Sequence, residues 1–383
     1  DEITLPPFLK FGSWVGGDRD GNPYVTHDIT IEVMRMQKEL MLRKYIEQIG
    51  WLKRHLSASK KLVPVSAELI ESIDRDRKLI DLEDGIKHSD ECYRIKLSYM
   101  ETKLRQTLEH MHNRSSDYFY SDKNAFIKDL EIIDRSLREN KGAHLADTTL
   151  KKLMTQVRVF GFHLAKLDVR QNSVVHRQAI EEISRKLGIA DYSEMSDSEK
   201  FTWLVDEIKT PRPLIPHWLE LSAETEELLN TFRTIREVIE HVDPQSIDTY
   251  VISMTSSANN VLEVLLLSTE AGLYVNNRGT VTSRLNIVPL FETIEDFKIA
   301  PDIMRKLYED PVYRKHLKSR GDISEIMIGY SDSGKDGGLL CSSWEIHQAQ
   351  MSLKKLADQY GLKNNFFNGR GGTVSRGGGP TIQ

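Results

Sequence analysis

Polar residues stand at or near the ends of five apolar runs in the C-terminal part of the sequence. The runs are VFGFHLAKLDVR, TYVISMT, NIVPLFET, SEIMIGYSD and NNFFNGR, and their polar residues are, in order, Asp168 and Arg170, Ser253 and Thr255, Glu292, Asp332, and Arg370. In a parallel β/α barrel the carboxyl ends of the strands form one rim, which carries the active site. The recurrence therefore predicts one shared site at such a rim.

The residue types at these run ends suit a metal ion and an anion. Glu292 and Asp332 offer the hard oxygen ligands that Mg²⁺ and Mn²⁺ prefer. Arginine's planar fork matches a carboxylate or phosphate, and lysine acts as a point charge. The candidate cations are Arg170, Lys335, Arg370 and Arg376. This set predicts a small, multiply anionic substrate such as a phosphorylated carboxylate, with the metal stabilising an enolate or a leaving phosphate.

Two glycine-rich stretches accompany these residues. GYSDSGKDGG places Lys335 three residues after Asp332, and GRGGTVSRGGGP holds Gly371 and Gly372 beside its first arginine. Glycine lets backbone N–H groups approach an anion closely, so both are predicted to be loops at the site. The alternatives are a plain turn before a helix starting near Leu339 for the first stretch, and a flexible linker or an RNA-binding segment for the second.

A third stretch, FGSWVGGDRDGNP, lies near the start of the sequence. It combines Trp14, Asp18, Arg19 and Asp20 with four glycines. A calcium-binding loop is the alternative interpretation, but the spacing of an EF-hand is missing. We expect a structured loop at or near the rim, in which Trp14 packs or gates and Arg19 orients other groups.

The intervening pattern predicts the elements that position these residues. After about Thr26, apolar residues recur at helical spacing, as in Met41, Tyr45, Ile49, Leu52 and Leu56. From about Val157, short strand-like runs alternate with helical segments, which indicates parallel strands.

The expected fold class is therefore α/β, with parallel strands that suit a β/α barrel. Its expected parts are a glycine-rich barrel segment over 1–26, a helical region over 27–156, and a partial barrel with the binding rim over 157–383. Helices are predicted from Ser173 to Gly188 and from Ser222 to near Val242, each capped by its serine.

Composition narrows the class of protein. The 383 residues carry a formal net charge of -5, which argues against a general nucleic-acid or membrane-surface binder. No apolar run reaches the roughly 18 residues that span a bilayer. Two cysteines are too few for a disulfide framework or a cysteine-built zinc site and fit a reducing compartment, so we expect a cytoplasmic protein. His163 is expected to be a core histidine within the first strand.

Six stretches in this order resemble phosphoenolpyruvate carboxylase. They are FGSWVGGDRDGNPYVT, FGFHLAKLDVRQNS, YVISMTSSANNVLEVLLL, VPLFET, MIGYSDSGKDGG and GRGGTVSRGGGP. The resemblance implies a lyase that adds bicarbonate to phosphoenolpyruvate, giving oxaloacetate and phosphate with Mg²⁺ or Mn²⁺. It implies carbon dioxide fixation that feeds the tricarboxylic acid cycle, a helix-rich, TIM-like β/α barrel, a tetramer and, in some members, allosteric control.

The same resemblance implies residue roles. Glu292 and Asp332 match the family's metal ligands, and Lys335 matches a lysine near that site. Arg170 matches an arginine that binds the phosphate-bearing substrate. Arg370 and Arg376 match the two arginines of the glycine-rich catalytic loop. The second of these also joins inhibitor binding in allosteric members.

The sequence departs from the family pattern in three ways. The family's TAHPTE motif and its downstream portion are absent, so the chain is expected to be a central segment, inactive alone. Asn368 stands where the family carries a histidine. An amide positions groups but does not transfer protons near neutral pH. Two alternatives follow: a homologue that only hydrolyses phosphoenolpyruvate to pyruvate, and a non-catalytic anion-binding or assembly module.

Overall fold

The computed structural model describes residues 8–82, 90–113 and 117–369 and divides the chain into two compact units. The first unit comprises Asp1–Ser13, Ile31–Lys166 and Glu237–Ser246. The second comprises Trp14–Thr30, Leu167–Arg236 and Ile247–Gln383. The division expected from the sequence, into parts over 1–26, 27–156 and 157–383, stays a prediction.

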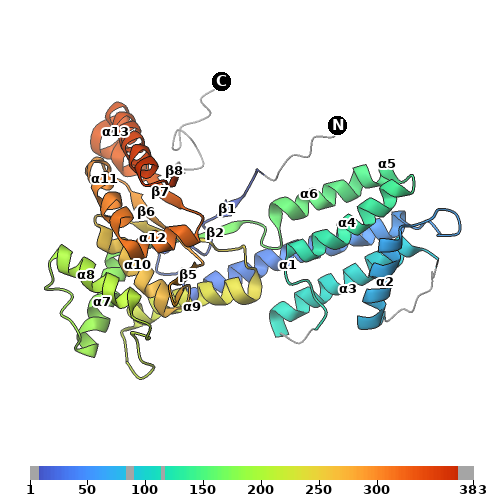
Figure 1. Ribbon diagram of the computed structural model, residues 1–383, viewed down its shortest axis with the longest axis horizontal. Coiled ribbons are helices and arrows are strands. Elements are labelled where there is room, and N and C mark those ends of the chain that lie inside the picture. The colour runs from blue at the N-terminus through green and yellow to red at the C-terminus, as the bar shows by residue number, and fades with distance from the viewer. Residues whose placement is uncertain (1–7, 83–89, 114–116, 370–383) are drawn as a thin grey trace. The chain divides into compact units, whose positions relative to one another are not determined.

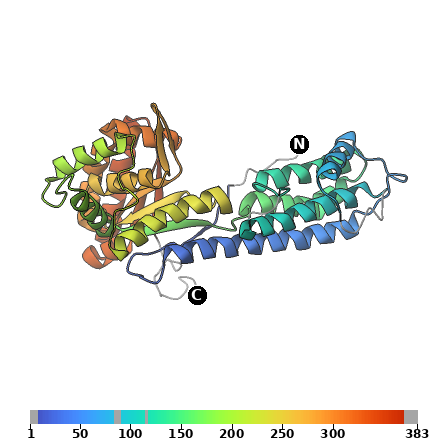
Figure 2. The same ribbon diagram turned by 90° about the horizontal axis from the view of Figure 1, so that it is seen from below.

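The first unit is helical. Its elements are β1 (Gly12–Ser13), α1 (His27–His55, whose first turn belongs to the second unit), α2 (Ala67–Leu79), α3 (Cys92–Asn113), α4 (Lys123–Glu139), α5 (Ala143–Leu145), η1 (Ala146–Leu150), α6 (Lys151–Phe160) and η2 (Val238–Val242). Figure 2 shows α1 running beside the other long helices of this unit. The predicted stripe is confirmed, because its four residues on α1 and Leu56, which follows α1 directly, are all buried in one core with residues of α3 and α4.

The second unit is an α/β structure. Its elements are β2 (Lys166–Asn172, starting one residue before this unit), α7 (Ser173–Leu187), α8 (Asp197–Lys209), α9 (Ala223–Glu237), β3 (Thr249–Ser253), α10 (Ala258–Glu270), β4 (Tyr274–Asn277), β5 (Thr280–Ser283), β6 (Asn286–Phe291), α11 (Ile294–Glu309), α12 (Pro311–Ser319), β7 (Ile323–Gly329), α13 (Ser331–Gln359) and β8 (Lys363–Gly369).

The sheet of this unit is parallel, in the order β2-β3-β6-β7-β8, as predicted for alternating strands and helices. Figure 1 shows β6, β7 and β8 side by side with α11, α12 and α13 beside them. In a flat sheet β2 and β8 would lie roughly 19 Å apart, at about 4.8 Å per strand. The Trp14 ring nevertheless contacts Arg170 of β2 and Phe367 of β8. The sheet therefore curls around Trp14 as a half-barrel.

Three local predictions were wrong. The first apolar run is not a strand throughout: α6 continues to Phe160, and a turn with positive φ at Gly161 and Leu164 precedes β2. His163 is buried as expected, but in this turn. Asn172, not Ser173, caps α7, since its side chain accepts a hydrogen bond from the Val174 N–H. Both residue types are good caps, so sequence alone left this boundary open by one residue.

The stretch GYSDSGKDGG was expected to be a loop, and its central part is helical. Helix α13 begins at Ser331, and its only break among the described residues is a kink at Gly338, where φ is 73°. The predicted start near Leu339 therefore marks this kink. The helix predicted from Ser222 is confirmed: α9 and η2 run continuously to Val242, and the Ser222 hydroxyl accepts a hydrogen bond from the Thr225 N–H.

Candidate functional site

The loop around Gly17 is joined to β2 as though it were a short extra strand. The Arg170 N–H donates to the Gly17 carbonyl at 2.9 Å, and the Arg19 N–H donates to the Arg170 carbonyl at 3.0 Å. Only glycine fits at position 17, because a Cβ there would lie 2.2 Å from the Asp168 carbonyl oxygen. The loop therefore lies beside the C-terminal half of β2, and its place at an active-site rim stays a prediction.

Two side chains of this loop hold the Arg170 guanidinium. Its Nε and Nη2 donate to Asp18 Oδ1 and Oδ2, each at 2.8 Å. Its Cζ lies 4.9 Å from the centre of the Trp14 ring, within the range of a cation–π contact. Partial burial alone would lower the pKa of Arg170, but the hydrogen bond to Asp18 and the charges of Asp18, Asp20 and Glu292 raise it. Arg170 is thus a fixed, permanently charged group near Glu292.

Arg19 is buried and donates its hydrogen bonds to other groups of the protein. Its guanidinium donates to the Gly17 carbonyl at 3.1 Å and to the Thr30 hydroxyl, which itself donates to the Gly16 carbonyl at 2.7 Å. Burial lowers the pKa of Arg19, and electrostatic interactions with Tyr250, Glu227 and Asp18 oppose this. These contacts fasten the loop to the start of α1, which agrees with an orienting role. Asp20 accepts a hydrogen bond from the Asn172 side chain at 3.3 Å.

Glu292 follows β6 and is positioned by three neighbours. The Asp296 carboxylate caps α11 and accepts the Glu292 N–H at 3.1 Å. Glu292 Oε2 accepts the Met254 N–H at 3.1 Å. Gly329 of the neighbouring strand leaves space for the Glu292 side chain, since a Cβ at residue 329 would lie 3.1 Å from Glu292 Cγ. A hard oxygen donor is therefore set firmly at this strand end.

Strand pairing puts Glu292 and Arg170 on one face of the sheet. Arg170 pairs with Val251, which pairs with Val288. Alternate residues of a strand share a face, so Glu292, four residues after Val288, points the same way. Buried residues of this face pack with Trp14 and Phe367 in one apolar cluster. The inner face of the half-barrel therefore ends in a cation and a carboxylate.

Met254 was missed by the sequence reasoning. It has φ of 55°, a left-handed conformation that is uncommon for a non-glycine residue. Its carbonyl accepts a hydrogen bond from the Ser173 hydroxyl at 2.8 Å, while its N–H holds Glu292. One strained residue thus links the ends of β2, β3 and β6. Sequence gives no signal for it, because methionine carries no left-handed preference.

This strain gives a first prediction. Glycine is normally less stable than alanine at a given position by about 0.4–1 kcal/mol, but at positive φ the order reverses. We expect Met254→Gly to be more stable than Met254→Ala by about 1 kcal/mol in urea unfolding. Equal stability, or the usual order, would show that residue 254 is not left-handed in solution.

Asn368 lies on the other face of β8 from Phe367, because neighbouring strand residues point to opposite faces. Its Oδ1 accepts a hydrogen bond from the Tyr330 hydroxyl at 2.7 Å, and Gln350 Nε2 lies within hydrogen-bond distance of the same oxygen at 3.4 Å. In this structure residue 368 therefore contacts α13 and its preceding residue. The hypothesis that the amide of Asn368 permits substrate binding but impairs proton handling stays a prediction.

The structure describes one side chain among the remaining predicted site residues, that of Lys335. Lys335 is exposed in the first turns of α13. The side chain of Asp332 lies outside the described part of the chain, as do Arg370, Gly371, Gly372 and Arg376. Within the described residues no group of three His, Cys, Asp or Glu side chains is arranged to hold a metal. Glu292 fits a hard divalent ion as a single ligand by the chemistry of its carboxylate, whose position the Met254 N–H fixes.

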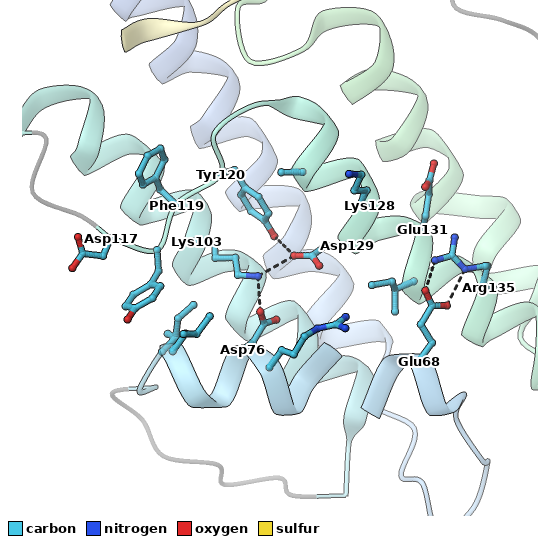
Figure 3. Close-up of a pocket in the computed structure, with 16 residues that line it drawn as sticks. Glu68, Asp76, Lys103, Asp117, Phe119, Tyr120, Lys128, Asp129, Glu131 and Arg135 are labelled. Carbon is cyan, nitrogen blue, oxygen red and sulfur yellow. Dashed lines mark hydrogen bonds and ion pairs between the residues drawn. The ribbon is translucent and has the colours of Figure 1, made fainter. Parts of the chain in front are cut away.

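A separate cavity of about 580 Å³ lies in the helical unit. Figure 3 shows Lys103 between Asp76 and Asp129, with Tyr120 donating to Asp129. Lys96, which is 1% exposed, contacts the same two carboxylates at 2.8 and 2.6 Å. Two lysines thus balance two aspartates, and we interpret this network as structural.

Among the helices of the described residues, none combines the length and the apolar character that crossing a bilayer requires.

Comparison with known proteins extends over the whole chain. A sequence model of the phosphoenolpyruvate carboxylase family matches residues 1–383. Phosphoenolpyruvate carboxylase of Roseiflexus castenholzii is 40% identical, over 99% of this chain and 42% of that protein. The enzymes so named from Prochlorococcus marinus strain MIT 9301 and from Synechocystis are 40% and 41% identical. They match 100% and 98% of this chain but only 41% and 40% of their own lengths, so the chain spans about two fifths of these relatives.

Proposed function

Because the chain belongs to the phosphoenolpyruvate carboxylase family, we propose that it carries part of a carboxylating active site. The reaction joins phosphoenolpyruvate and bicarbonate into oxaloacetate and phosphate. The supporting observation is the placement of Arg170 and Glu292 at strand ends on one face of a parallel sheet. A cation and a hard-metal ligand at one rim are what a phosphorylated carboxylate requires.

The proposed roles follow from residue chemistry. Arg170, Arg370 and Arg376 bind the phosphate and carboxylate, and the backbone at Gly371 and Gly372 contributes N–H groups. Glu292 and Asp332 hold Mg²⁺ or Mn²⁺, with Lys335 nearby. A bound divalent ion supplies positive charge where an enolate oxygen develops.

The proposed chemistry balances in two stages. A bicarbonate oxygen attacks phosphorus, the bond between phosphorus and the enol oxygen breaks, and carboxyphosphate and the enolate of pyruvate form. Carboxyphosphate then releases CO₂, and the proton that bicarbonate brought stays with the released phosphate. The enolate C3 attacks CO₂ and forms the new carbon–carbon bond of oxaloacetate. Arg170, already charged and fixed, requires little reorganisation to hold the departing phosphate.

The wider properties are proposals drawn from the relatives. They include closure of the half-barrel into a TIM-like barrel, a homotetramer, allosteric control, a cytoplasmic location and supply of oxaloacetate to the tricarboxylic acid cycle. We propose that the 383-residue chain alone is inactive, since it spans about two fifths of those proteins. Hydrolysis of phosphoenolpyruvate to pyruvate is the second candidate, favoured by the amide at Asn368.

A binding experiment tests the proposed site. In Glu292→Gln the charge is lost while the shape is kept, so we expect Mn²⁺ affinity, measured by calorimetry with phosphoenolpyruvate present, to fall at least tenfold. Glu295→Gln is the matched control, because Glu295 is 75% exposed three residues away and contacts Lys298 on the surface. It should change the affinity less than twofold.

The outcomes separate the candidates. Mn²⁺ binding that is unaffected by Glu292→Gln would contradict the proposed metal site and favour the non-catalytic anion-binding or assembly module. A coupled malate dehydrogenase assay reports oxaloacetate, and a lactate dehydrogenase assay reports pyruvate. Oxaloacetate from this chain would contradict its inactivity, and pyruvate without oxaloacetate would identify the hydrolase.

A further inference from the structure

We propose that Asp18 is a positioning residue, which fixes the direction in which Arg170 offers its charge to the substrate. The inference rests on the proposed function, because Arg170 is the phosphate-binding group in it. Asp18 and Arg170 lie 152 positions apart in the sequence, and the sequence pattern indicates that Asp18 is near the site without indicating its role.

The contact between the two side chains is of a directional kind. Asp18 engages Nε and Nη2 of Arg170 through its two oxygens, both at 2.8 Å. A guanidinium carries five N–H donors in one plane, so this paired contact fixes the plane and leaves Nη1 pointing away from Asp18. Within residues 8–82, 90–113 and 117–369, Nη1 has no hydrogen-bond partner.

The carboxylate itself is held in place by the backbone. Asp18 forms a bridge with Arg170, and backbone hydrogen bonds of Gly17 and Arg19 flank it on both sides. Asp18 Oδ1 also accepts the Asp20 N–H at 3.3 Å. Trp14 covers one face of the guanidinium. A flexible arginine therefore has its orientation set before any ligand arrives, which reduces the entropy lost on binding.

Charge alone predicts the opposite effect of Asp18. A carboxylate beside an anion site repels the anion, so an aspartate with only an electrostatic influence would weaken substrate binding. Positioning and repulsion thus give opposite signs when the charge is removed. This difference makes the role of Asp18 measurable.

The test compares two variants by calorimetric titration with phosphoenolpyruvate in the presence of Mn²⁺. Asp18→Asn removes the charge, and Asp18→Glu keeps it but moves the carboxylate by one methylene. We expect both to weaken binding at least fivefold, because both lose the paired contact. Asp28→Asn removes the same charge from an 84% exposed side chain of α1 and should change the affinity less than twofold.

A second measurement reports the contact without substrate. The Nε–H signal of Arg170 in a ¹⁵N spectrum, assigned by its loss in Arg170→Lys, should be protected from solvent exchange. In Asp18→Asn the protection of this Nε–H from solvent exchange should fall at least tenfold.

Each outcome bears on one proposal. Tighter binding by Asp18→Asn, or unchanged binding by Asp18→Glu, would overturn the positioning role. So would an unprotected Nε–H in the unsubstituted chain, a result that holds even where a variant does not fold. If the unsubstituted chain binds no phosphoenolpyruvate while Nε–H is protected, the proposed function fails and the contact stands as structural.

Discussion

Gly17→Ala is expected to destabilise the second unit by about 3 kcal/mol, as for an overpacked site that cannot relax. The added Cβ would lie 2.2 Å from the Asp168 carbonyl oxygen and 3.0 Å from Leu167 Cδ1. The first neighbour is backbone inside the sheet, so it yields little. The loop must instead move away from β2, which breaks the hydrogen bond from the Arg170 N–H to the Gly17 carbonyl.

The same displacement removes function, since the loop carries Asp18 and Trp14. We therefore expect phosphoenolpyruvate affinity to fall together with the free energy of unfolding, measured by urea titration and calorimetry. Gly50→Ala is the control: it lies inside α1, where the nearest atom to a new Cβ is a side-chain nitrogen at 3.9 Å. It should raise stability by up to about 1 kcal/mol. A cost below about 1 kcal/mol for Gly17→Ala would mean that the loop does not contact β2 this closely.

Although the hairpin of β4 and β5 was not predicted, four strands of the parallel sheet, β3, β6, β7 and β8, could be predicted to within about three residues. Each is a short run of branched and aromatic residues that ends in polar ones, and this pattern is typical of buried parallel strands. The strand predicted for the first run was wrong over its first half. Residues 159–165 are mostly apolar, and such a segment is buried equally well as a helix end and turn or as a strand. Periodicity alone does not separate a buried helix end and turn from a strand. The start of α13 was not predicted, because three of its early residues are glycines, which disfavour a helix. The surrounding structure nevertheless imposes a helix there.

The candidate site was predicted in its residue types but not in its geometry. Glu292 and Arg170 stood out because charged groups follow apolar strands. Their partners did not: Asp18 contacts Arg170 across 152 positions, and Met254 holds Glu292 with a backbone N–H. Neither contact depends on local spacing, because each arises from the pairing of segments that are distant in the sequence. Asn368 illustrates the converse, since its sequence position indicated the rim while strand alternation turns its side chain toward Tyr330.

Removal of Lys96 is expected to have the largest effect on the helical unit. Lys96→Met leaves Asp76 and Asp129 to share Lys103 in a buried network, and breaking such a network typically costs 3–5 kcal/mol, so we expect about 3 kcal/mol. Lys44→Met is the matched control, because Lys44 is exposed and its pair with Glu47 contributes at most about 1 kcal/mol. Urea unfolding of both variants measures the difference.

The loss should depend on pH with a definite sign. Burial alone would raise the pKa of Asp129, but the charges of Lys96 and Lys103 hold it below its ordinary value. A lowered pKa contributes stability that is present above the unfolded value of about 3.9 and is lost as pH falls through the folded value. Lys96→Met removes the lysine with the larger electrostatic effect on Asp129 and so raises that pKa. The stability gap should therefore be greatest near neutral pH and narrow below about pH 4.

A double variant separates a broken network from lost packing. Lys96→Met with Asp76→Leu leaves Lys103 and Asp129 as a balanced pair, with Tyr120 still donating to Asp129. Since replacing paired charges by apolar groups is often neutral, we expect the double variant to recover at least about 1 kcal/mol of the loss. Losses that simply add would show that Lys96 stabilises the unit through its aliphatic stem. A gap that widens in acid would contradict the proposed charge balance.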